Sequence, residues 1–219
     1  MSYVKPKLRF ILALIVNVSP NLAAAEQVYF SDGWSEHRFS LFSSNDFVLG
    51  GDILNVISKK TVSILWTRLP LSMWGGRQAK WDWAVELSVP PTNLTQKGGD
   101  DRNLSIYFLF LPDEAAQESI NSGLTSLLGN PDARVLMYLW GGGHSPGQVL
   151  PTPYLGSRGR SLILQAAGTG SASEQVDLER DYRKAFTSEP KNLVGIAVSS
   201  DSDDTGSEVA ASVSYLYVE

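Results

Sequence analysis

Apolar and polar residues alternate along much of the chain, which is the pattern of strands that bury one face. In KWDWAVELSV (80–89), Trp81, Trp83 and Val85 occupy every second position, and polar or small residues stand between them. Side chains of a strand point alternately to its two faces, so this segment presents one apolar face. We therefore predict a strand that packs on a core through its tryptophan-bearing face.

A second class of segment is apolar at almost every position. LSIYFLFL (104–111) is the clearest case, and it is typical of a central strand covered on both faces. Two β-rich runs around Gly50-Gly51 indicate a hairpin. The other strand-like runs are VYFSDGW, HRFSLF, TVSILWTRL, RVLMYLW, SLILQA, LVGIAVSS and VAASVSYLYV. About ten short strands separated by Gly, Pro, Asn and Asp clusters predict an all-β fold, a jelly-roll-like β-sandwich.

Two segments have helical patterns instead. Residues 114–128 lie between a Pro-Asp start signal and a Gly-Asn stop signal. Residues 174–186 carry an apolar stripe, acidic residues in the first turn, and Arg183 and Lys184 in the last turn, which matches the helix dipole. We predict two short peripheral helices on one β-sandwich domain that spans residues 26–219.

The first 25 residues have the layout of a secretory signal peptide. Basic residues precede the apolar stretch FILALIVNV (10–18), and the small residues Ala23 to Ala25 follow a proline. The apolar run is shorter than the about 20 residues that a membrane-spanning helix needs, and no later stretch is long enough either. We therefore predict a signal peptide at 1–25 with cleavage near Ala25, and a mature protein that is periplasmic or secreted.

Charge and cysteine content narrow the classes of partner. Three of the 18 Lys and Arg residues lie in the predicted signal peptide, so the mature chain keeps 15 against 23 Asp and Glu, a net charge of −8. This balance argues against nucleic acid and anionic membrane surfaces as partners, and it is compatible with cations or neutral polar ligands. The chain has no cysteine, which excludes thiol catalysis, thiolate metal sites and disulfides.

Several segments, in order along the chain, resemble a family of exported bacterial proteins called DUF3047. They are WDWAVEL (81–87), KGGDDRNLSIYFLF (97–110), YLWGGGHSPGQVLPTPY (138–154), ERDYRKAF (179–186) and LVGIAVSSDSDDTGSEVAASVSYLYV (193–218). The family has no established activity. The resemblance therefore implies an export route and an architecture, and it does not imply a particular function.

The chain departs from the family pattern at several polar positions. Ser105 stands where the family tends to carry Arg, and Met137 and Gly142 stand where it tends to carry Asn. Asp204 replaces an Asn in the Asp-rich loop, and an Asn-Pro-Tyr reads Thr-Pro-Tyr at 152–154. If the polar residues at these places contact a ligand in relatives, the resemblance implies that this contact is altered here.

The loop SDSDDTG (200–206) brings together the carboxylates of Asp201, Asp203 and Asp204. Calcium takes about six to eight oxygen ligands, and clustered carboxylates between strands are a common source of them. The loop is therefore a candidate Ca²⁺ site, to which the acidic pair at 100–101 could add ligands. The alternative is a solvated turn in which Asp and Thr side chains bond nearby backbone amides.

The acidic pair itself, Asp100 and Asp101, stands directly before the most apolar strand. At the rim of a sheet these carboxylates could bind a hydroxyl group of a ligand or a cation. They could also be a polar stop that keeps a hydrophobic strand edge from pairing with other chains. We take ligand contact as the prediction and the polar stop as its alternative.

A glycine-rich turn and the segment after it supply the remaining candidates. WGGGHSPG (140–147) lacks both the GK[ST] sequence and the following helix of a phosphate-binding loop. We interpret it as a loop that lets a ligand approach the backbone, or as a plain turn. Trp140 is expected to be exposed beside it. We predict that Trp140, His144, Tyr154 and Arg158 contact the ligand, and the alternative for His144 is an exposed side chain without a role.

The leading functional hypothesis is non-catalytic binding of a polar ligand such as a glycan. The binding surface is predicted to consist of the loops at 97–101, 140–154 and 201–206, because the loops of a sandwich gather at its two ends. One alternative is a polysaccharide-active hydrolase or lyase that uses an acidic pair, for which two facing carboxylates would be needed. The other is a structural or interaction protein of the cell envelope without a small ligand.

Overall fold

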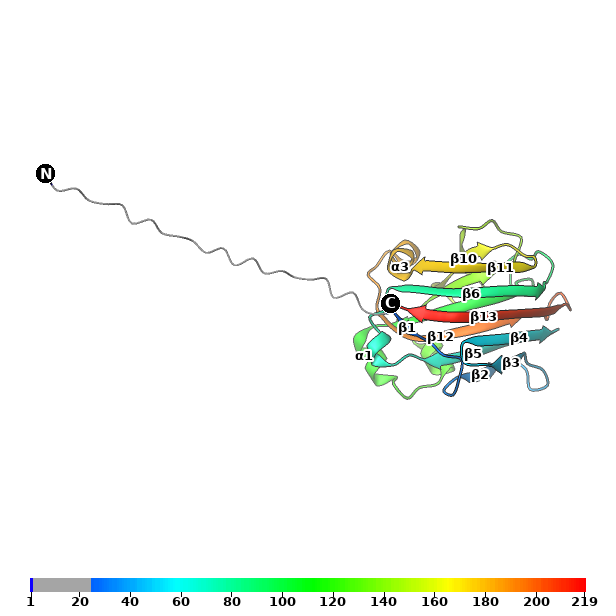
Figure 1. Cartoon of the computed structure of the whole chain (residues 1–219), viewed down its shortest axis with the longest axis horizontal. Coiled ribbons are helices and arrows are strands. Elements are labelled where there is room, and N and C mark those ends of the chain that lie inside the picture. The colour runs from blue at the N-terminus through cyan, green and yellow to red at the C-terminus, as the bar shows by residue number, and fades with distance from the viewer. Residues whose placement is uncertain (2–24) are drawn as a thin grey trace.

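The computed structural model describes residues 25–219 together with Met1. The predicted signal peptide therefore lies almost entirely outside the described residues, and export stays a prediction. Two β-sheets stack face to face and carry short helices at their periphery (Figure 1). Among the described residues, no helix has the length and apolar character needed to cross a membrane.

The first sheet has six strands, and all its neighbouring strands are antiparallel. Its order is β11-β6-β13-β4-β3, and the short β1 also pairs with β13. The strands are β1 (Glu26–Gln27), β3 (Asp46–Leu49), β4 (Ile53–Lys59), β6 (Gln78–Leu87), β11 (Gly170–Asp177) and β13 (Glu208–Val218).

The second sheet has seven strands in the order β2-β5-β12-β7-β8-β10-β9. Its neighbours are antiparallel except β8 and β10, which run parallel. The strands are β2 (Ser35–Arg38), β5 (Val62–Arg68), β7 (Arg102–Leu111), β8 (Arg134–Trp140), β9 (Val149–Thr152), β10 (Gly156–Gln165) and β12 (Asn192–Asp201). The predicted all-β, jelly-roll-like sandwich is confirmed, with additional short strands at the sheet edges.

The core fills the space between the two sheets and is rich in aromatic side chains. Trp81 and Trp83 of β6 are each 2% exposed, and both point inward as the alternating pattern predicts. The ring of Trp81 lies 5.7 Å from that of Tyr138, and the ring of Trp83 lies 5.5 Å from that of Trp140. Tilted and edge-to-face contacts of this kind join β6 of one sheet to β8 of the other and stabilise the stack.

The helices are shorter than the sequence predicts. The structure has a 3₁₀ turn, η1 (Leu71–Met73), and three α-helices, α1 (Asp113–Glu118), α2 (Leu124–Gly129) and α3 (Leu178–Phe186).

The helix predicted over 114–128 is interrupted between α1 and α2, where Gly123 stands in extended conformation before α2. The helix predicted over 174–186 begins only at Leu178. Residues 174–177 belong to β11, where they pair with β6, and the Asp177 side chain then caps α3 by accepting the amide N–H of Arg180 at 2.8 Å.

Candidate functional site

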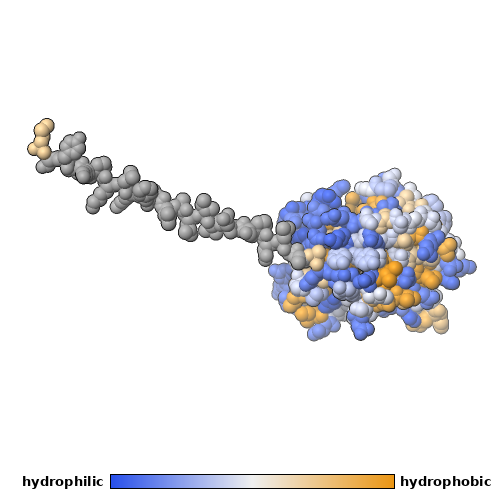
Figure 2. All heavy atoms as spheres, viewed as in Figure 1, coloured by the Kyte–Doolittle hydropathy of each residue, from blue (hydrophilic) through white to orange (hydrophobic). Residues whose placement is uncertain are grey.

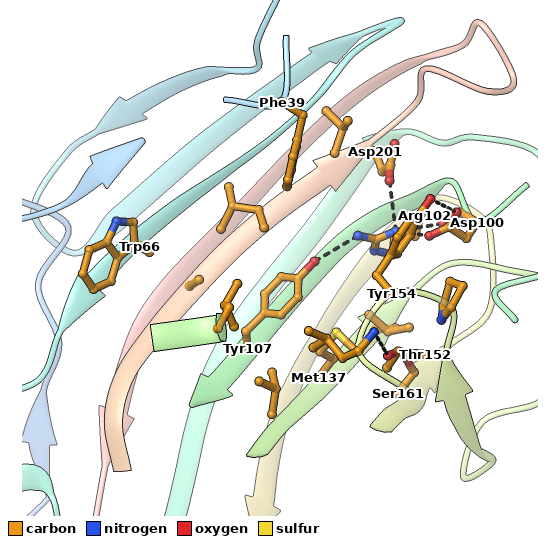
Figure 3. A pocket seen from close by; sticks show the side chains of 18 of the residues that line it. Phe39, Trp66, Asp100, Arg102, Tyr107, Met137, Thr152, Tyr154, Ser161 and Asp201 are labelled. Carbon is orange, nitrogen blue, oxygen red and sulfur yellow. Dashed lines mark hydrogen bonds and ion pairs between the residues drawn. The ribbon is translucent and has the colours of Figure 1, made fainter. Parts of the chain in front are cut away.

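The outer face of the seven-stranded sheet, which points away from the six-stranded sheet, forms the floor of a cleft. Strand register places Trp66, Ala197, Tyr107, Met137 and Ser161 side by side across β5, β12, β7, β8 and β10 (Figure 3). Strand β12, between β5 and β7, contributes only the methyl group of Ala197 to this row. A small side chain between two large aromatic ones leaves open volume above the sheet.

This open volume is a cavity of about 440 Å³. Ligand pockets typically measure about 300–1,000 Å³, so it has the size of a small-molecule site. Two leucines of α2, Leu124 and Leu128, line it, as do Leu155 after β9 and Phe39 after β2. The lining is therefore apolar over most of the floor and walls, and its charged groups are concentrated at one end, which we call the acidic end.

A buried guanidinium group organises the acidic end. Arg102 Nε donates to Ser105 Oγ at 2.6 Å, and Nη2 donates to the hydroxyl of Tyr107 at 2.9 Å. Its Nη1 donates to Asp100 Oδ2 at 3.2 Å and to Asp201 Oδ2 at 3.0 Å, and also to the Asp100 carbonyl at 2.9 Å. Burial alone would lower the pKa of Arg102, but Tyr107 and the two carboxyl groups raise it, so the group is a fixed cation.

Asp201 is the most unusual group at this end. The residue is 7% exposed, and its Oδ1 atom has no hydrogen-bond partner among the described residues. Burial raises its pKa to about 8, and the charges of Asp203 and Asp101 add to the shift while Arg102 opposes it. Asp201 therefore carries a proton at neutral pH, because desolvation disfavours the charged form by more than the guanidinium group of Arg102 favours it.

Asp101 holds the loop that follows β12. Its Oδ2 accepts the backbone N–H of Thr205 at 2.7 Å and the hydroxyl of the same residue, and its Oδ1 accepts the N–H of Asp204 at 3.3 Å. Carboxylate oxygens of Asp101, Asp201 and Asp203 lie within 4.8 Å of one another, which is close enough for a metal ion. Whether the cluster holds Ca²⁺ stays a prediction, and Asp204 is not part of it.

Tyr154 closes the acidic end from the turn after β9. Its hydroxyl donates to Asp100 Oδ1 at 3.1 Å, and Lys97 Nζ lies 5.3 Å from the centre of its ring. Burial and the neighbouring Asp100 raise the pKa of Tyr154 to about 12, so the hydroxyl stays protonated. The contacts between the loop before β7 and this turn bring together segments about fifty residues apart.

Only some residues of the predicted binding loops lie together at the cleft. Asp100, Tyr154, Asp201, Asp203 and Asp204 all line the cleft, whereas Asp101 lies behind it and is fully buried. These residues come from the segments 97–101, 140–154 and 201–206 that the sequence analysis singles out. The cleft extends beyond them along the outer face of the sheet, and no sequence pattern indicates this extension.

Three further predicted contact residues, besides Asp101, do not line the cleft. The expected exposure of Trp140 is wrong: it is 4% exposed, faces the core with the other inward residues of β8, and donates through Nε1 to the Gly168 carbonyl at 3.1 Å. His144 accepts the N–H of Leu94 through Nε2 at 3.2 Å. Arg158 donates to the Asn130 carbonyl at 3.0 Å and so ties the strand to the end of α2.

The cleft also contains residues that were not predicted to contact a ligand, above all Arg102, Tyr107 and Trp66. One signal was present in β7. An almost continuous apolar run implies that both faces of the strand are covered, yet within residues 25–219 no second layer of sheet lies over the outer face. Ser105 and Tyr107 are the polar residues of that run, and Arg102 and Tyr107 are the positions of β7 that are not fully buried. Two departures from the family pattern, Ser105 and Met137, also lie on this face.

One of the comparisons with known proteins identifies a family. The DUF3047 family, described as a protein of unknown function, matches residues 32–217, so the predicted resemblance is confirmed. No curated protein sequence matches the chain.

Among solved structures, the xyloglucanase domain of NopAA, a type three effector from Sinorhizobium fredii in complex with cellobiose, is 12% identical. The alignment covers 90% of this chain and 98% of that one, with a TM-score of 0.44. The family 11 xylanase from Neocallimastix patriciarum is 13% identical over 91% of this chain and 97% of that one, with a TM-score of 0.41.

Proposed function

Since the chain belongs to the DUF3047 family, whose function is not established, we propose from its cleft that it is a non-catalytic binding protein. The ligand presents an apolar face to the sheet and a polar end to the acidic end of the cleft. One observation carries this proposal: an apolar cavity of about 440 Å³ on the outer face of a sheet, with its charged groups gathered at one end. Apolar pockets with a few convergent polar groups are typical of ligand sites.

A glycan is the ligand class that we propose first. The C–H faces of sugar rings stack on flat aromatic side chains, and Trp66, Tyr107 and Phe39 offer such faces in the cleft. Hydroxyl groups at the end of the sugar would meet Asp100 and Tyr154. The two residues are hydrogen-bonded to each other, and both keep oxygen atoms that can accept further hydrogen bonds.

A glycan-binding screen on the mature protein, followed by calorimetry with the best oligosaccharide, tests this proposal. We expect Trp66→Ala to weaken binding by up to about tenfold, because one aromatic stacking contact contributes about 0.5–1.5 kcal/mol. The matched control is Tyr215→Ala, since Tyr215 is an exposed aromatic residue of the six-stranded sheet. An equal loss of affinity in both variants, or no binding of any glycan, contradicts the glycan proposal.

Polysaccharide hydrolysis is the second candidate, and the raised pKa of Asp201 favours it, because a general acid must keep its proton at neutral pH. A hydrolase also needs a second carboxylate across the substrate. Asp100 and Asp201 instead accept from the same nitrogen of Arg102 and so lie on one side of the cleft. We therefore place binding first. Release of reducing ends that disappears in Asp201→Asn would reverse this order.

A bound metal ion is not required by the proposed function. Calcium needs about six to eight oxygen ligands, and both oxygens of Asp101 already accept hydrogen bonds from the loop. We expect the midpoint of thermal unfolding to stay the same with Ca²⁺ and with EDTA. A midpoint that Ca²⁺ raises would instead support the predicted cation site, because a ligand that binds the native state stabilises it.

A further inference from the structure

We infer that the ligand is a glycan joined to an alkyl chain, and that the chain lies in the end of the cleft opposite the acidic end. This inference rests on the proposed function and names the chemistry of a second part of the same ligand. We call this end of the cleft the roofed end, and the residues that line it are Leu109, Leu124, Leu128, Val135 and Leu155.

The first step is the position of the roofed end, which follows from strand register. Beyond the row that contains Tyr107, Gly195 of β12 pairs with Leu109 of β7, and Leu109 pairs with Val135 of β8. Asp201, at the acidic end, is six residues from Gly195 along β12, and a strand rises about 3.3 Å per residue, so the cleft floor is about 20 Å long. A floor of this length holds a sugar ring over the aromatic row and a further group beyond it.

The second step is that α2 forms a fixed roof over this end. Its Leu124 packs on Ile64 and Ala197 in a small apolar cluster that is separate from the main core. Arg68 donates through Nη2 to two carbonyl groups of the turn before α2, at 2.7 and 2.9 Å. Arg158 donates to a carbonyl group directly after α2, at 3.0 Å. Hydrogen bonds at both ends therefore hold α2 above the sheet in addition to its apolar contacts.

The side wall of the roofed end is also aliphatic. A Cβ atom on Gly159 would lie 2.8 Å from the Cβ atom of Leu155, so Leu155 occupies the space that a side chain of β10 would fill. Gly159 pairs with Val135, which places Leu155 at the level of the roofed end. The floor, the roof and this wall thus meet around one space.

The third step is the chemistry of that space. All five side chains of the roofed end are aliphatic and offer no hydrogen bond, and the charged residues of the cleft stand at its other end. A second sugar ring placed here would remove its hydroxyl groups from water without giving them partners, which is unfavourable. An alkyl chain has no polar group to desolvate and gains free energy when it leaves water. The roofed end therefore favours a hydrocarbon chain over a longer glycan.

A series of β-D-glucosides with one headgroup tests the inference. Methyl, butyl, hexyl and octyl glucoside differ only in the length of the alkyl chain, and calorimetry is carried out below the concentration at which octyl glucoside forms micelles. Affinity is expected to rise by up to about fourfold for each added methylene group, which corresponds to about 0.8 kcal/mol. The rise should end when the chain fills the roofed end.

Variants locate the chain within the cleft. Leu128→Asn places an amide group in the roofed end, and it should remove most of the gain of octyl over methyl glucoside without changing the affinity of methyl glucoside. The matched control is Leu87→Asn, since Leu87 is 48% exposed and lies outside the cleft, and it should leave the gain unchanged. Trp66→Ala should weaken all four glucosides by a similar factor. Should Leu128→Asn fail to fold, Leu155→Asn makes the same comparison from the side wall.

The outcomes separate this inference from the proposed function. If affinity does not depend on chain length, or if no glucoside binds, the inference is overturned and the glycan screen decides about the proposed function on its own. If Leu128→Asn and Leu155→Asn keep the full gain of octyl glucoside, the chain binds elsewhere and the inference is overturned. If 1-octanol binds as tightly as octyl glucoside, the sugar contributes nothing, and both the inference and the glycan proposal are contradicted.

Discussion

The two sheets turn very different outer faces to their surroundings. On the six-stranded sheet, Lys80, Asp82 and Glu86 of β6 and Ser212 and Ser214 of β13 occupy the outward positions. Figure 2 views the molecule from this side, and hydrophilic residues cover most of it while apolar ones form smaller patches. The outer face of the seven-stranded sheet instead carries the apolar row of the cleft.

The difference supports the proposal that the outer face of the seven-stranded sheet binds a ligand. A sheet in a sandwich needs only one apolar face, and polar residues on the other face cost nothing in core packing. An outer face that stays apolar without a covering layer exposes hydrophobic surface, and such surface marks an interaction site. The cleft is deep because β12 places Gly195 and Ala197 between larger neighbours, while the core face of the same sheet is filled with aromatic rings.

The largest effect on stability is expected on the core face of the seven-stranded sheet. Phe108 is fully buried, with its ring 5.7 Å from that of Tyr138, and Phe108→Ala should lower the free energy of unfolding by about 3–5 kcal/mol. Met137→Ala enlarges a cavity that already exists on the other face of the sheet. It should therefore lower the free energy of unfolding by less than about 2 kcal/mol. Urea denaturation of both variants measures the difference, and equal losses would show that the cleft is as tightly packed as the core.

The second effect concerns the pH dependence of stability at the acidic end. The pKa of Asp201 is about 8 in the folded protein and about 3.9 in an unfolded chain, so the folded state binds this proton more strongly. The stability that protonated Asp201 contributes is complete below about pH 4. It is lost as the pH rises towards about 8, and the free energy of unfolding falls by up to about 1.4 kcal/mol per pH unit.

The variant Asp201→Asn keeps the uncharged shape and removes the titration. Its free energy of unfolding should therefore change less between mildly acidic and mildly basic pH than that of the wild type. Chemical denaturation at a series of pH values measures this, with Asp132→Asn as the control on an exposed turn. Parallel pH profiles of the wild type and Asp201→Asn would mean that this carboxyl group is ionised at neutral pH.

The fold was largely predictable from local pattern. The alternation around Trp81 and the apolar run of β7 depend only on which face of a strand is buried, and both are confirmed. The helix predicted over 114–128 was wrong in extent, because periodicity does not reveal that the chain turns between α1 and α2. The expected exposure of Trp140 was wrong for a related reason. Its glycine-rich neighbours suggested exposure, but side chains alternate along β8, and Trp140 lies on the face that packs on the core.

The site was predictable only where polar residues stand out in the sequence. The acidic runs that contain Asp100 and Asp201 are conspicuous, and both line the cleft. Arg102 and Trp66 are not conspicuous, because their role comes from pairing across β5, β12 and β7, which are far apart along the chain. This register cannot be derived from local sequence, so the row of residues on the cleft floor is seen only in the folded structure.

The smallest effect compares two exposed tyrosines, one on each outer face. Tyr154 is 62% exposed and Tyr215 is 52% exposed, so removing either hydroxyl disturbs little packing. Tyr154→Phe breaks the hydrogen bond to Asp100 and should lower the free energy of unfolding by about 0.5–1 kcal/mol. Tyr215 has no side-chain hydrogen bond within residues 25–219, and Tyr215→Phe should stay within about 0.5 kcal/mol of the wild type. If urea denaturation gives the same value for both variants, the bond between Tyr154 and Asp100 does not order the acidic end, and the two outer faces then differ in composition alone.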